Sequence, residues 1–272
     1  GDDTKRIDAL KSAANSFIDE IAKQNATVKD AVKQHQVAIV KFAGNKTDKV
    51  GNGRYRDDGN WYNYSQVMKT LAPCINDTKS DFSSQVNAIK PAGATNAAAG
   101  LELAKGQTSK RSDARKVVIF FTDGTPTEYS DFSPEVASSA VGYAKDMKDA
   151  GAVVYSIGIF QGADPATYPD PQCVSNENNF MHAVSSNYPS ATYSYESTSW
   201  WSGEYIWNFG YRAKGSDGKD ATFYKSATNA DELKHVFDDI SKEIIKGAGY
   251  PTETSEGYES RTGYITFDDQ LG

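Results

Sequence analysis

The sequence predicts an α/β protein with a doubly wound, mostly parallel Rossmann-like sheet and helices on both of its faces. The first observation behind this prediction is the continuous apolar run 117–121, which ends in Thr-Asp-Gly and is typical of a strand buried on both faces. The second is that two further strand-like runs, 36–43 and 152–160, are separated from it by segments with helical spacing. Strands that alternate with helices of this size form parallel sheets covered on both sides.

Each element follows from its own pattern. Apolar residues recur at helical spacing over about 4–24, with charged and polar residues between them. A Pro/Gly turn before Thr95 leads into an Ala-rich helix. The next helix, 136–148, has Pro134 near its start and Gly151 past its end. A last amphipathic helix covers 231–246 and ends at Gly247.

Composition limits the class of protein. The chain has 272 residues, of which 38% are hydrophobic and 24% charged, so it can bury a large core and is not disordered overall. Its net charge of −7 and the lack of a basic cluster argue against nucleic acid as a partner. It contains no apolar run near 18 residues, so no membrane span is predicted.

Two long stretches, 44–91 and 162–218, break the alternation and are interpreted as insertions. Aromatic residues among Ser, Gly and Asn make good contact surfaces, and the second stretch carries such a group. The candidates for a surface that binds protein or sugar are Trp200, Trp201, Tyr205, Trp207 and Tyr211. The alternative is that they pack a small satellite core.

The two cysteines, Cys74 and Cys173, belong to no CxxC motif, and the three histidines are scattered, which argues against a zinc site. In an extracellular protein the two cysteines could form a disulfide that closes a loop of about a hundred residues. The alternative is two free thiols.

Asp123 follows the apolar strand 117–121 directly, at the carboxyl end, where ligands of open α/β sheets bind. An aspartyl phosphotransfer site would need its nucleophilic aspartate at the position of Phe121, two residues before Asp123, so the nucleophile is missing and that chemistry is excluded. A carboxylate that holds a hard cation fits the position, because Mg²⁺ and Ca²⁺ favour oxygen ligands. The alternative is that Asp123 only caps the turn that follows the strand.

Thr95 stands where the Ala-rich helix begins, with Asn96 beside it. Its hydroxyl could hold the same cation as Asp123, or it could be the N-cap of the helix. Thr95 and Asp123 in this order, about 28 residues apart with the start of a strand between them, form the most specific pattern in the chain.

These segments resemble a von Willebrand factor type A domain. The resemblance rests on five segments: the first helix, GATNAAAGLELA, KVVIFFTDGTPT, VVYSIGIF and the closing helix. They follow one another in the order found in the family. The stretch 185–189 and the late helix look most like the versions on Gram-positive surface and pilus-tip adhesins. The resemblance implies a type A domain over 1–246.

In this family a metal-ion-dependent adhesion site takes Asp-x-Ser-x-Ser from the first strand, a Thr from a second loop and an Asp from a third. Thr95 matches the second position and Asp123 the third, which implies Mg²⁺, Mn²⁺ or Ca²⁺ as the ion. Asp-x-Ser-x-Ser is absent from these residues. The first strand is therefore expected just upstream, or from a strand-donating segment of the same surface protein.

The composition changes in the tail 247–272, where a linker rich in Gly, Thr, Glu and Ser precedes a short strand with alternating polar and apolar residues at 262–267. We interpret it as the return of the chain to a neighbouring β-rich domain. The rival interpretation is that this strand fills the vacant first-strand position. Tyr264, Thr266 and Asp268 favour a half-exposed edge over a doubly buried centre.

The function that the resemblance implies is a non-enzymatic adhesion module, located outside the cell on the surface, cell wall or pilus. Its partner would be a host or extracellular-matrix protein or glycan, bound through the ion to a ligand carboxylate. The alternative is a structural pilus or cell-wall subunit, in which the fold is a scaffold and the aromatic insertions make the contacts. No nucleophile, base and orienting group can be assembled from the motifs, so no enzyme is predicted.

Overall fold

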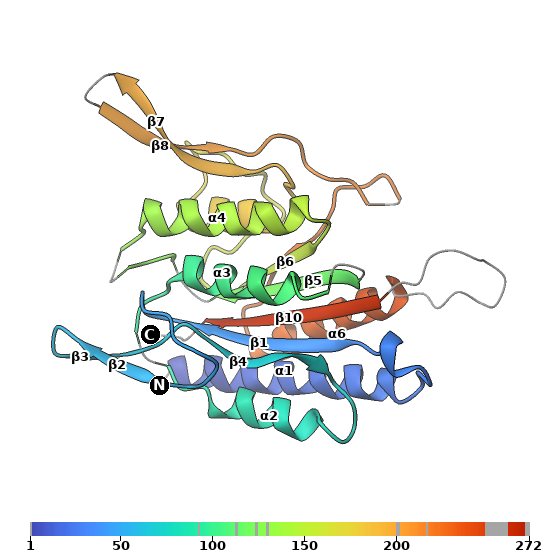
Figure 1. Ribbon diagram of the computed structural model, residues 1–272. Helices are drawn as coiled ribbons and strands as arrows, with labels where there is room; N and C mark the ends of the chain where they lie inside the picture. Colours follow the sequence, from blue (N-terminus) through green and yellow to red (C-terminus); the bar gives the residue numbers. More distant parts are fainter. Residues whose placement is uncertain are drawn as a thin grey trace.

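The computed structural model shows a six-stranded sheet between two layers of helices (Figure 1). It describes residues 2–91, 93–111, 114–122, 125–128, 131–199, 202–215, 217–247 and 261–269, and of the last range it describes the backbone. The strand order is β4-β1-β10-β5-β6-β9. The strands are β1 (Gln36–Phe42), β4 (Gln66–Pro73), β5 (Ala114–Thr122), β6 (Val153–Gly158), β9 (Tyr224–Ser226) and β10 (Arg261–Asp269). All neighbours pair in parallel except β1 with β4, so the predicted doubly wound α/β fold is confirmed.

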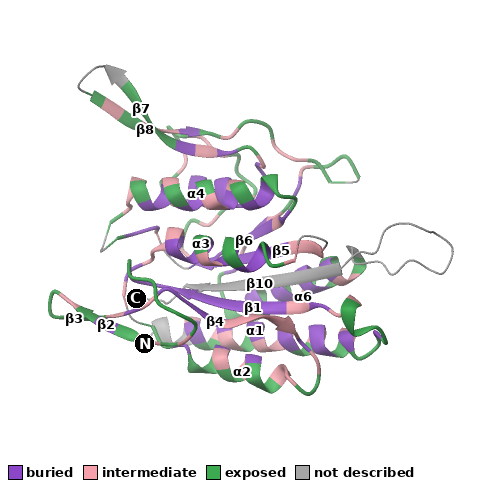
Figure 2. Ribbon diagram, viewed as in Figure 1, coloured by how far each residue is buried: buried purple, intermediate pink, exposed green. Residues whose placement is uncertain are grey.

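Side chains of the central strands alternate between two cores. In β5, Val117, Ile119 and Phe121 face one core, and Val118 and Phe120 face the other. All five are fully buried, and Figure 2 shows this part of β5 in the buried colour and the start of the strand in the intermediate one. A strand buried on both faces needs apolar residues at every position, which is why its sequence is a continuous apolar run.

The helices form one layer on each face of the sheet. One core is closed by α1 (Asp2–Asn25), α2 (Lys79–Ala88) and α6 (Ala230–Gly247). The other is closed by α3 (Ala97–Thr108), α4 (Pro134–Asp149) and α5 (Asn176–Val184). A short 3₁₀ helix, η1 (Ala31–Lys33), precedes β1. None of the helices within the described residues is long and apolar enough to cross a membrane.

Local sequence sets the helix boundaries. The Ser133 hydroxyl accepts a hydrogen bond from the Val136 amide and Pro134 begins α4, while Ser175 caps α5 in the same way. Gly100 lets α3 approach β1 closely, because a Cβ there would come within 2.7 Å of the Phe42 side chain. This close approach brings the start of α3 to the end of β1.

The segment 44–91 is more than an insertion, which corrects the sequence interpretation. It contains the hairpin of β2 (Arg54–Asp57) and β3 (Asn60–Asn63), but also β4 and α2. β4 is the antiparallel edge strand of the main sheet. Its sequence signal is weak because only Gln66, Val67 and Met68 are buried, and the rest of the strand is half-exposed.

The segment 162–218 also contributes to the fold. It contains α5, whose Phe180, Met181 and Val184 belong to the second core. It then forms a hairpin of β7 (Thr192–Ser199) and β8 (Ser202–Asn208) beyond α4. In Figure 1 both hairpins, β2–β3 and β7–β8, project from the body of the protein.

The largest difference from the sequence interpretation concerns the tail. β10 does not leave for a neighbouring domain but lies at the centre of the sheet, parallel to β1 on one side and to β5 on the other. Ile265 pairs with Ala38 of β1 and with Val118 of β5. The rival interpretation was correct, because a central gap would leave two rows of backbone groups unpaired, and that cost outweighs a side-chain pattern typical of an edge.

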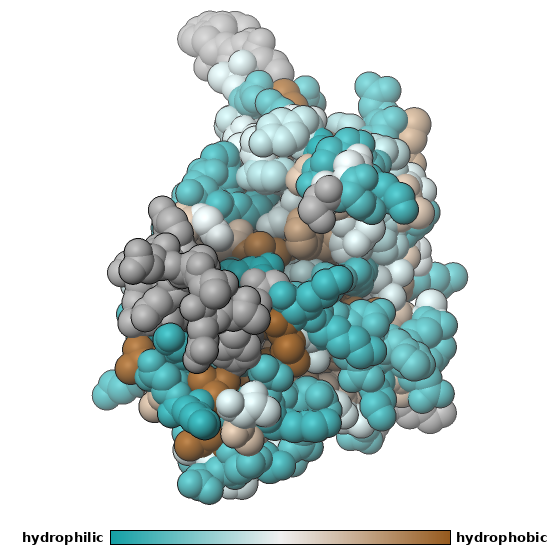
Figure 3. Space-filling view, turned by 90° about the vertical axis from the view of Figure 1, so that its right-hand side faces the viewer, coloured by the Kyte–Doolittle hydropathy of each residue, from teal (hydrophilic) through white to brown (hydrophobic). Residues whose placement is uncertain are grey.

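The two ends of the parallel sheet differ in the elements and side chains found there. Figure 1 shows β10 ending at the same end where α1 begins, and we call this the carboxyl end of the sheet. Figure 3 looks at the opposite end, where hydrophilic side chains cover most of the surface and apolar ones gather only in small groups. The β2–β3 and β7–β8 hairpins point toward the carboxyl end (Figure 1).

The position of β10 can be tested with a proline at Ile265. Proline lacks the amide proton and does not fit a central strand, so Ile265→Pro is expected to lower the free energy of unfolding by about 3 kcal/mol or more. Urea denaturation followed by circular dichroism compares this variant with the unsubstituted chain; equal stability of the two would contradict the central position of β10.

Candidate functional site

Thr95 lies at the carboxyl end of the sheet, in the loop that enters α3. The Asn96 amide donates to the Ala43 carbonyl at 2.8 Å, which ties this loop to the end of β1. The helix is capped by Asn96, whose Oδ1 accepts from the Ala99 amide at 3.0 Å. The N-cap is therefore Asn96 and not Thr95, so capping does not occupy the Thr95 hydroxyl. Within the described residues that hydroxyl makes no hydrogen bond.

Two hydrogen bonds join the Thr95 loop to the loop that follows β5. The Thr95 amide donates to the Thr127 hydroxyl at 3.0 Å, and the Thr127 amide donates back to the Thr95 carbonyl at 3.0 Å. A reciprocal pair of this kind fixes both the separation and the relative orientation of two loops. The structure thus holds Thr95 beside the connection that carries Asp123.

Asp123 itself lies outside the described residues, between Thr122 at the end of β5 and Thr125. Its role as an ion ligand stays a prediction. Within the described residues no group of three or more His, Cys, Asp or Glu side chains is placed to hold a metal ion. The end of β10 adds two acidic residues to this end of the sheet, since Asp268 pairs in register with Lys41 and Asp269 with Phe42.

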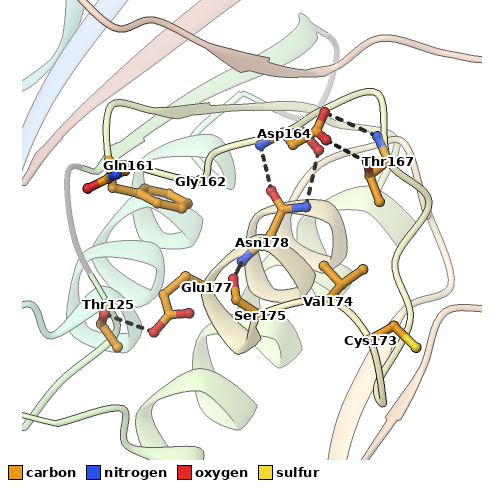
Figure 4. A pocket seen from close by; sticks show the side chains of 11 residues that line it. Thr125, Gln161, Gly162, Asp164, Thr167, Cys173, Val174, Ser175, Glu177 and Asn178 are labelled. Atoms are coloured by element: carbon orange, nitrogen blue, oxygen red, sulfur yellow. Dashed lines mark hydrogen bonds between the residues drawn. The ribbon is translucent and has the colours of Figure 1, made fainter.

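A pocket of about 510 Å³ opens beside these loops (Figure 4). Its walls come from the loops after β5 and β6 and from the start of α5, and they include Thr125, Phe160, Asp164, Glu177 and Asn178. The Thr125 hydroxyl donates to Glu177 Oε1 at 3.1 Å on one side of the pocket (Figure 4). Sequence reasoning missed these residues because they are single polar positions in a long connection, without a motif. Their place after the strand 152–160 was the one available signal.

The Asp164 carboxylate organises the wall opposite Thr125. Its oxygens accept hydrogen bonds from the Thr167 hydroxyl and from the amides of Ala166 and Thr167. The Thr167 hydroxyl and these two amides hold the pKa of Asp164 below its ordinary value. The Asn178 side chain accepts from the Asp164 amide at 2.9 Å and donates to the Asp164 carbonyl at 3.1 Å, which fastens the loop to α5 (Figure 4).

Buried polar groups hold α5 in place. At its carboxyl end the Lys148 ammonium donates to the carbonyls of Ala183, Ser185 and Tyr188, at 2.7, 3.2 and 3.1 Å. His182 is fully buried on the same helix, and its Nε2 lies 2.8 Å from the Thr167 carbonyl. Burial lowers the pKa of His182 to about 4. The pocket is therefore built on a helix anchored at both ends.

The buried imidazole predicts a pH dependence of stability. Because the pKa of His182 is about 4 in the folded chain and 6.5 in the unfolded one, the unfolded state binds more protons between these values, and stability falls as pH falls through this window. The loss at pH 4.5 is expected to be about 2–3 kcal/mol. His182→Gln cannot be protonated, so denaturation at pH 7 and 4.5 is expected to show a smaller loss in this variant; an equal loss would contradict the buried neutral histidine.

The predicted aromatic surface divides into two parts. Trp207 is only 8% exposed, stacks on Tyr193 at 3.8 Å between ring centroids, and donates from Nε1 to the Asn176 side chain of α5 at 3.2 Å. It belongs to the second core and not to a separate satellite core, with Tyr205 half-buried beside Tyr193. Trp200 and Trp201 lie outside the described residues. Among the described residues of this hairpin, Tyr195 is exposed, at 59%.

Substitutions can separate the two parts. Trp207→Ala is expected to cost about 3–5 kcal/mol of folding free energy, because it empties a packed site and removes the bond to Asn176. Tyr195→Ala is the matched control on the facing strand and is expected to change stability by less than about 0.5 kcal/mol. Thermal and chemical denaturation measure both; a Trp207→Ala variant as stable as Tyr195→Ala would show that Trp207 is not core.

The two cysteines do not form a disulfide, which corrects the sequence interpretation. Cys74 is buried and Cys173 is exposed, and both are free thiols. Cys74 sits in the first core, where its thiol contacts the Ile18 carbonyl at 3.6 Å, and burial raises its pKa to about 12. Cys173 lines the pocket on the opposite face of the sheet.

Comparisons with known proteins agree with this architecture. The family model described as von Willebrand factor type A domain matches residues 5–192. A comparison with curated proteins finds no match.

Solved structures with the same fold come from pilus proteins. The von Willebrand factor domain of the type V pili tip protein Mfa5 from Porphyromonas gingivalis has a TM-score of 0.56 at 11% identity, with 93% of each chain covered. The pilus adhesin SpaC from Lactobacillus rhamnosus GG, in an open conformation, has a TM-score of 0.55 at 17% identity and covers 91% of this chain. The minor pilin PilB from Streptococcus sanguinis has a TM-score of 0.53 at 14% identity and covers 91% of this chain. The chain spans 29% of the SpaC chain and 56% of the PilB chain.

Proposed function

The chain belongs to the von Willebrand factor type A domain family, and we propose that it is an adhesion module that binds its ligand through a divalent cation. The observation that carries the proposal is the Thr95 loop. Asn96 takes the capping role, and the reciprocal bonds with Thr127 hold Thr95 beside the connection that carries Asp123. A free hydroxyl next to a carboxylate loop, at the carboxyl end of a parallel sheet, suits a hard cation.

The residues that would hold the ion are Thr95 and Asp123, with Asp268 and Asp269 as further candidates. The last two stand at the end of β10, the strand in the position where the family carries Asp-x-Ser-x-Ser. They offer carboxylates in place of that motif but no serine hydroxyls. This donor set is all oxygen, which favours Mg²⁺, Mn²⁺ or Ca²⁺ over zinc or copper. The bound ion would supply a positive charge that attracts a carboxylate of the ligand.

The partner we propose is a host or extracellular-matrix protein or glycan, met outside the cell on a surface, cell wall or pilus. Structural relatives described as pilus adhesin, pili tip protein and minor pilin support this setting. The function proposed is binding without catalysis. Neighbouring domains of the same surface protein are further contacts of the chain.

A structural role as a pilus or cell-wall subunit is the second candidate. It is favoured by the projecting hairpins, on which Trp61 of β3 is 56% exposed and Tyr195 of β7 is 59% exposed (Figure 1). Exposed aromatic side chains give large rigid contact areas. Contacts of this kind would not depend on a cation.

The ion site can be tested directly by Mn²⁺ titration. Asp123→Ala and Thr95→Val are each expected to weaken Mn²⁺ binding by about tenfold or more, because each removes an oxygen ligand. Thr95→Ser keeps the hydroxyl and is expected to bind normally. Asn96→Ala, the neighbouring control, is expected to lose about 1 kcal/mol of stability through the lost cap but to keep its Mn²⁺ affinity.

Adhesion separates the two candidate functions. Beads coated with the chain are expected to adhere to immobilised extracellular matrix in Mg²⁺ and to be released by EDTA, and Asp123→Ala beads are expected not to adhere. Adhesion that survives both EDTA and Asp123→Ala would reject the ion-dependent module in favour of contacts made by the hairpins.

A further inference from the structure

The pocket at the start of α5 is a separate concave site beside the proposed ion. Its volume is about 510 Å³, and Thr125 in its wall is two residues beyond Asp123 on the same loop. Figure 4 shows the Glu177 side chain pointing toward Thr125, with Asp164 and Asn178 across the pocket. One connection, between β5 and α4, thus serves both the pocket and the proposed ion site.

The charged side chains that line the pocket are negative. Among the described residues, those that line it include two acids, Asp164 and Glu177, and no lysine, arginine or histidine. Hydrogen bonds from Thr167 and Ala166 occupy the Asp164 carboxylate and keep it ionised. A carboxylate pair without a basic neighbour attracts a cation and repels an anion.

Glu177 is the acid that remains open to a ligand. Its Oε1 accepts a single hydrogen bond, from the Thr125 hydroxyl, and among the described residues it has no basic partner. A carboxylate accepts about four hydrogen bonds in all, so most of its capacity is unused. Glu177 lies in the first turn of α5, on the side that faces the Thr125 loop.

The walls of the pocket are rigid rather than adaptable. Asn178 fastens the Asp164 loop to α5, and Lys148 and His182 anchor the helix behind it. The Phe160 ring supplies an apolar wall. A pocket lined by one aromatic ring and an acid suits an aliphatic stem that carries a positive charge, because the stem packs on the ring and the charge meets the carboxylate.

We propose that this pocket binds a lysine or arginine side chain of the protein ligand, with Glu177 as its counter-ion. The inference rests on the proposed function, because it places the basic group on the same ligand whose carboxylate meets the cation. The ligand motif is then an acidic residue with a basic residue close by in space. A ligand of this kind contacts the two sides of the β5–α4 connection at once.

A pair of small probes tests the pocket without the ion. Nα-acetyl-lysine methylamide carries one ammonium and no carboxylate, and its Nε-acetylated form is neutral. Each is titrated into the ¹⁵N-labelled chain in the presence of EDTA. The charged probe is expected to shift the amide signals of Thr125, Glu177 and Asn178, and the neutral probe is expected to leave them unchanged.

Variants assign the effect to Glu177. Glu177→Gln is expected to weaken binding of the charged probe by about fivefold, the effect of a partly exposed ion pair. Glu196→Gln on the exposed face of β7 removes the same charge away from the pocket and is expected to have no effect. Asp123→Ala is also expected to leave probe binding unchanged, so failure of the ion site and failure of the pocket give different results. Equal binding of the neutral probe, or unchanged binding to Glu177→Gln, would overturn the proposal.

Discussion

The backbone pairing of β10 with β1 and β5 is the constraint on which the rest of the structure depends. β10 divides the sheet at its middle, with β4 and β1 on one side and β5, β6 and β9 on the other. Without it, the facing edges of β1 and β5 would carry unpaired amides and carbonyls, and the two cores would lose the layer that separates them. The strand that completes the sheet follows α6 in the sequence, far from the two strands that it joins.

The proposed sites follow from this arrangement of strands. Parallel strands end on one side, so the loops after β1, β5 and β6 meet there together with the end of β10. Two local contacts then fix the positions of the loops. The reciprocal Thr95–Thr127 bonds lock the entry of α3 to the exit of β5, and Gly100 lets α3 lie close against Phe42. On the far side, Lys148 and Trp207 hold α5, and α5 carries Glu177 into the pocket. Packing in the core thereby fixes the positions of Thr95 and Glu177, which lie at the surface.

The sequence predicts the parts of this fold whose signal is local. The run 117–121 identifies a doubly buried strand, and the position of Thr95 at a helix start follows from the Pro/Gly turn and the alanines. Edge strand β4 was missed because five of its eight residues are only partly buried, which weakens the apolar pattern. β10 was assigned to a neighbouring domain because Tyr264, Thr266 and Asp268 alternate as they would in an edge strand. Its position in the structure depends instead on hydrogen bonds with the backbones of β1 and β5, which are distant in sequence. Glu177 carries no motif, so only the folded chain brings it opposite Thr125.

Hydrogen exchange of the amides in 261–269 tests the central claim most directly. A strand paired on both sides opens only when the sheet unfolds, so these amides are expected to exchange as slowly as those of β5 at 117–121. Mass spectrometry of peptides from the two segments, after timed labelling under native conditions, compares them in one sample. Equal protection would establish β10 as the strand that completes the sheet. Exchange of 261–269 at the rate of an unstructured peptide, with β5 still protected, would contradict it.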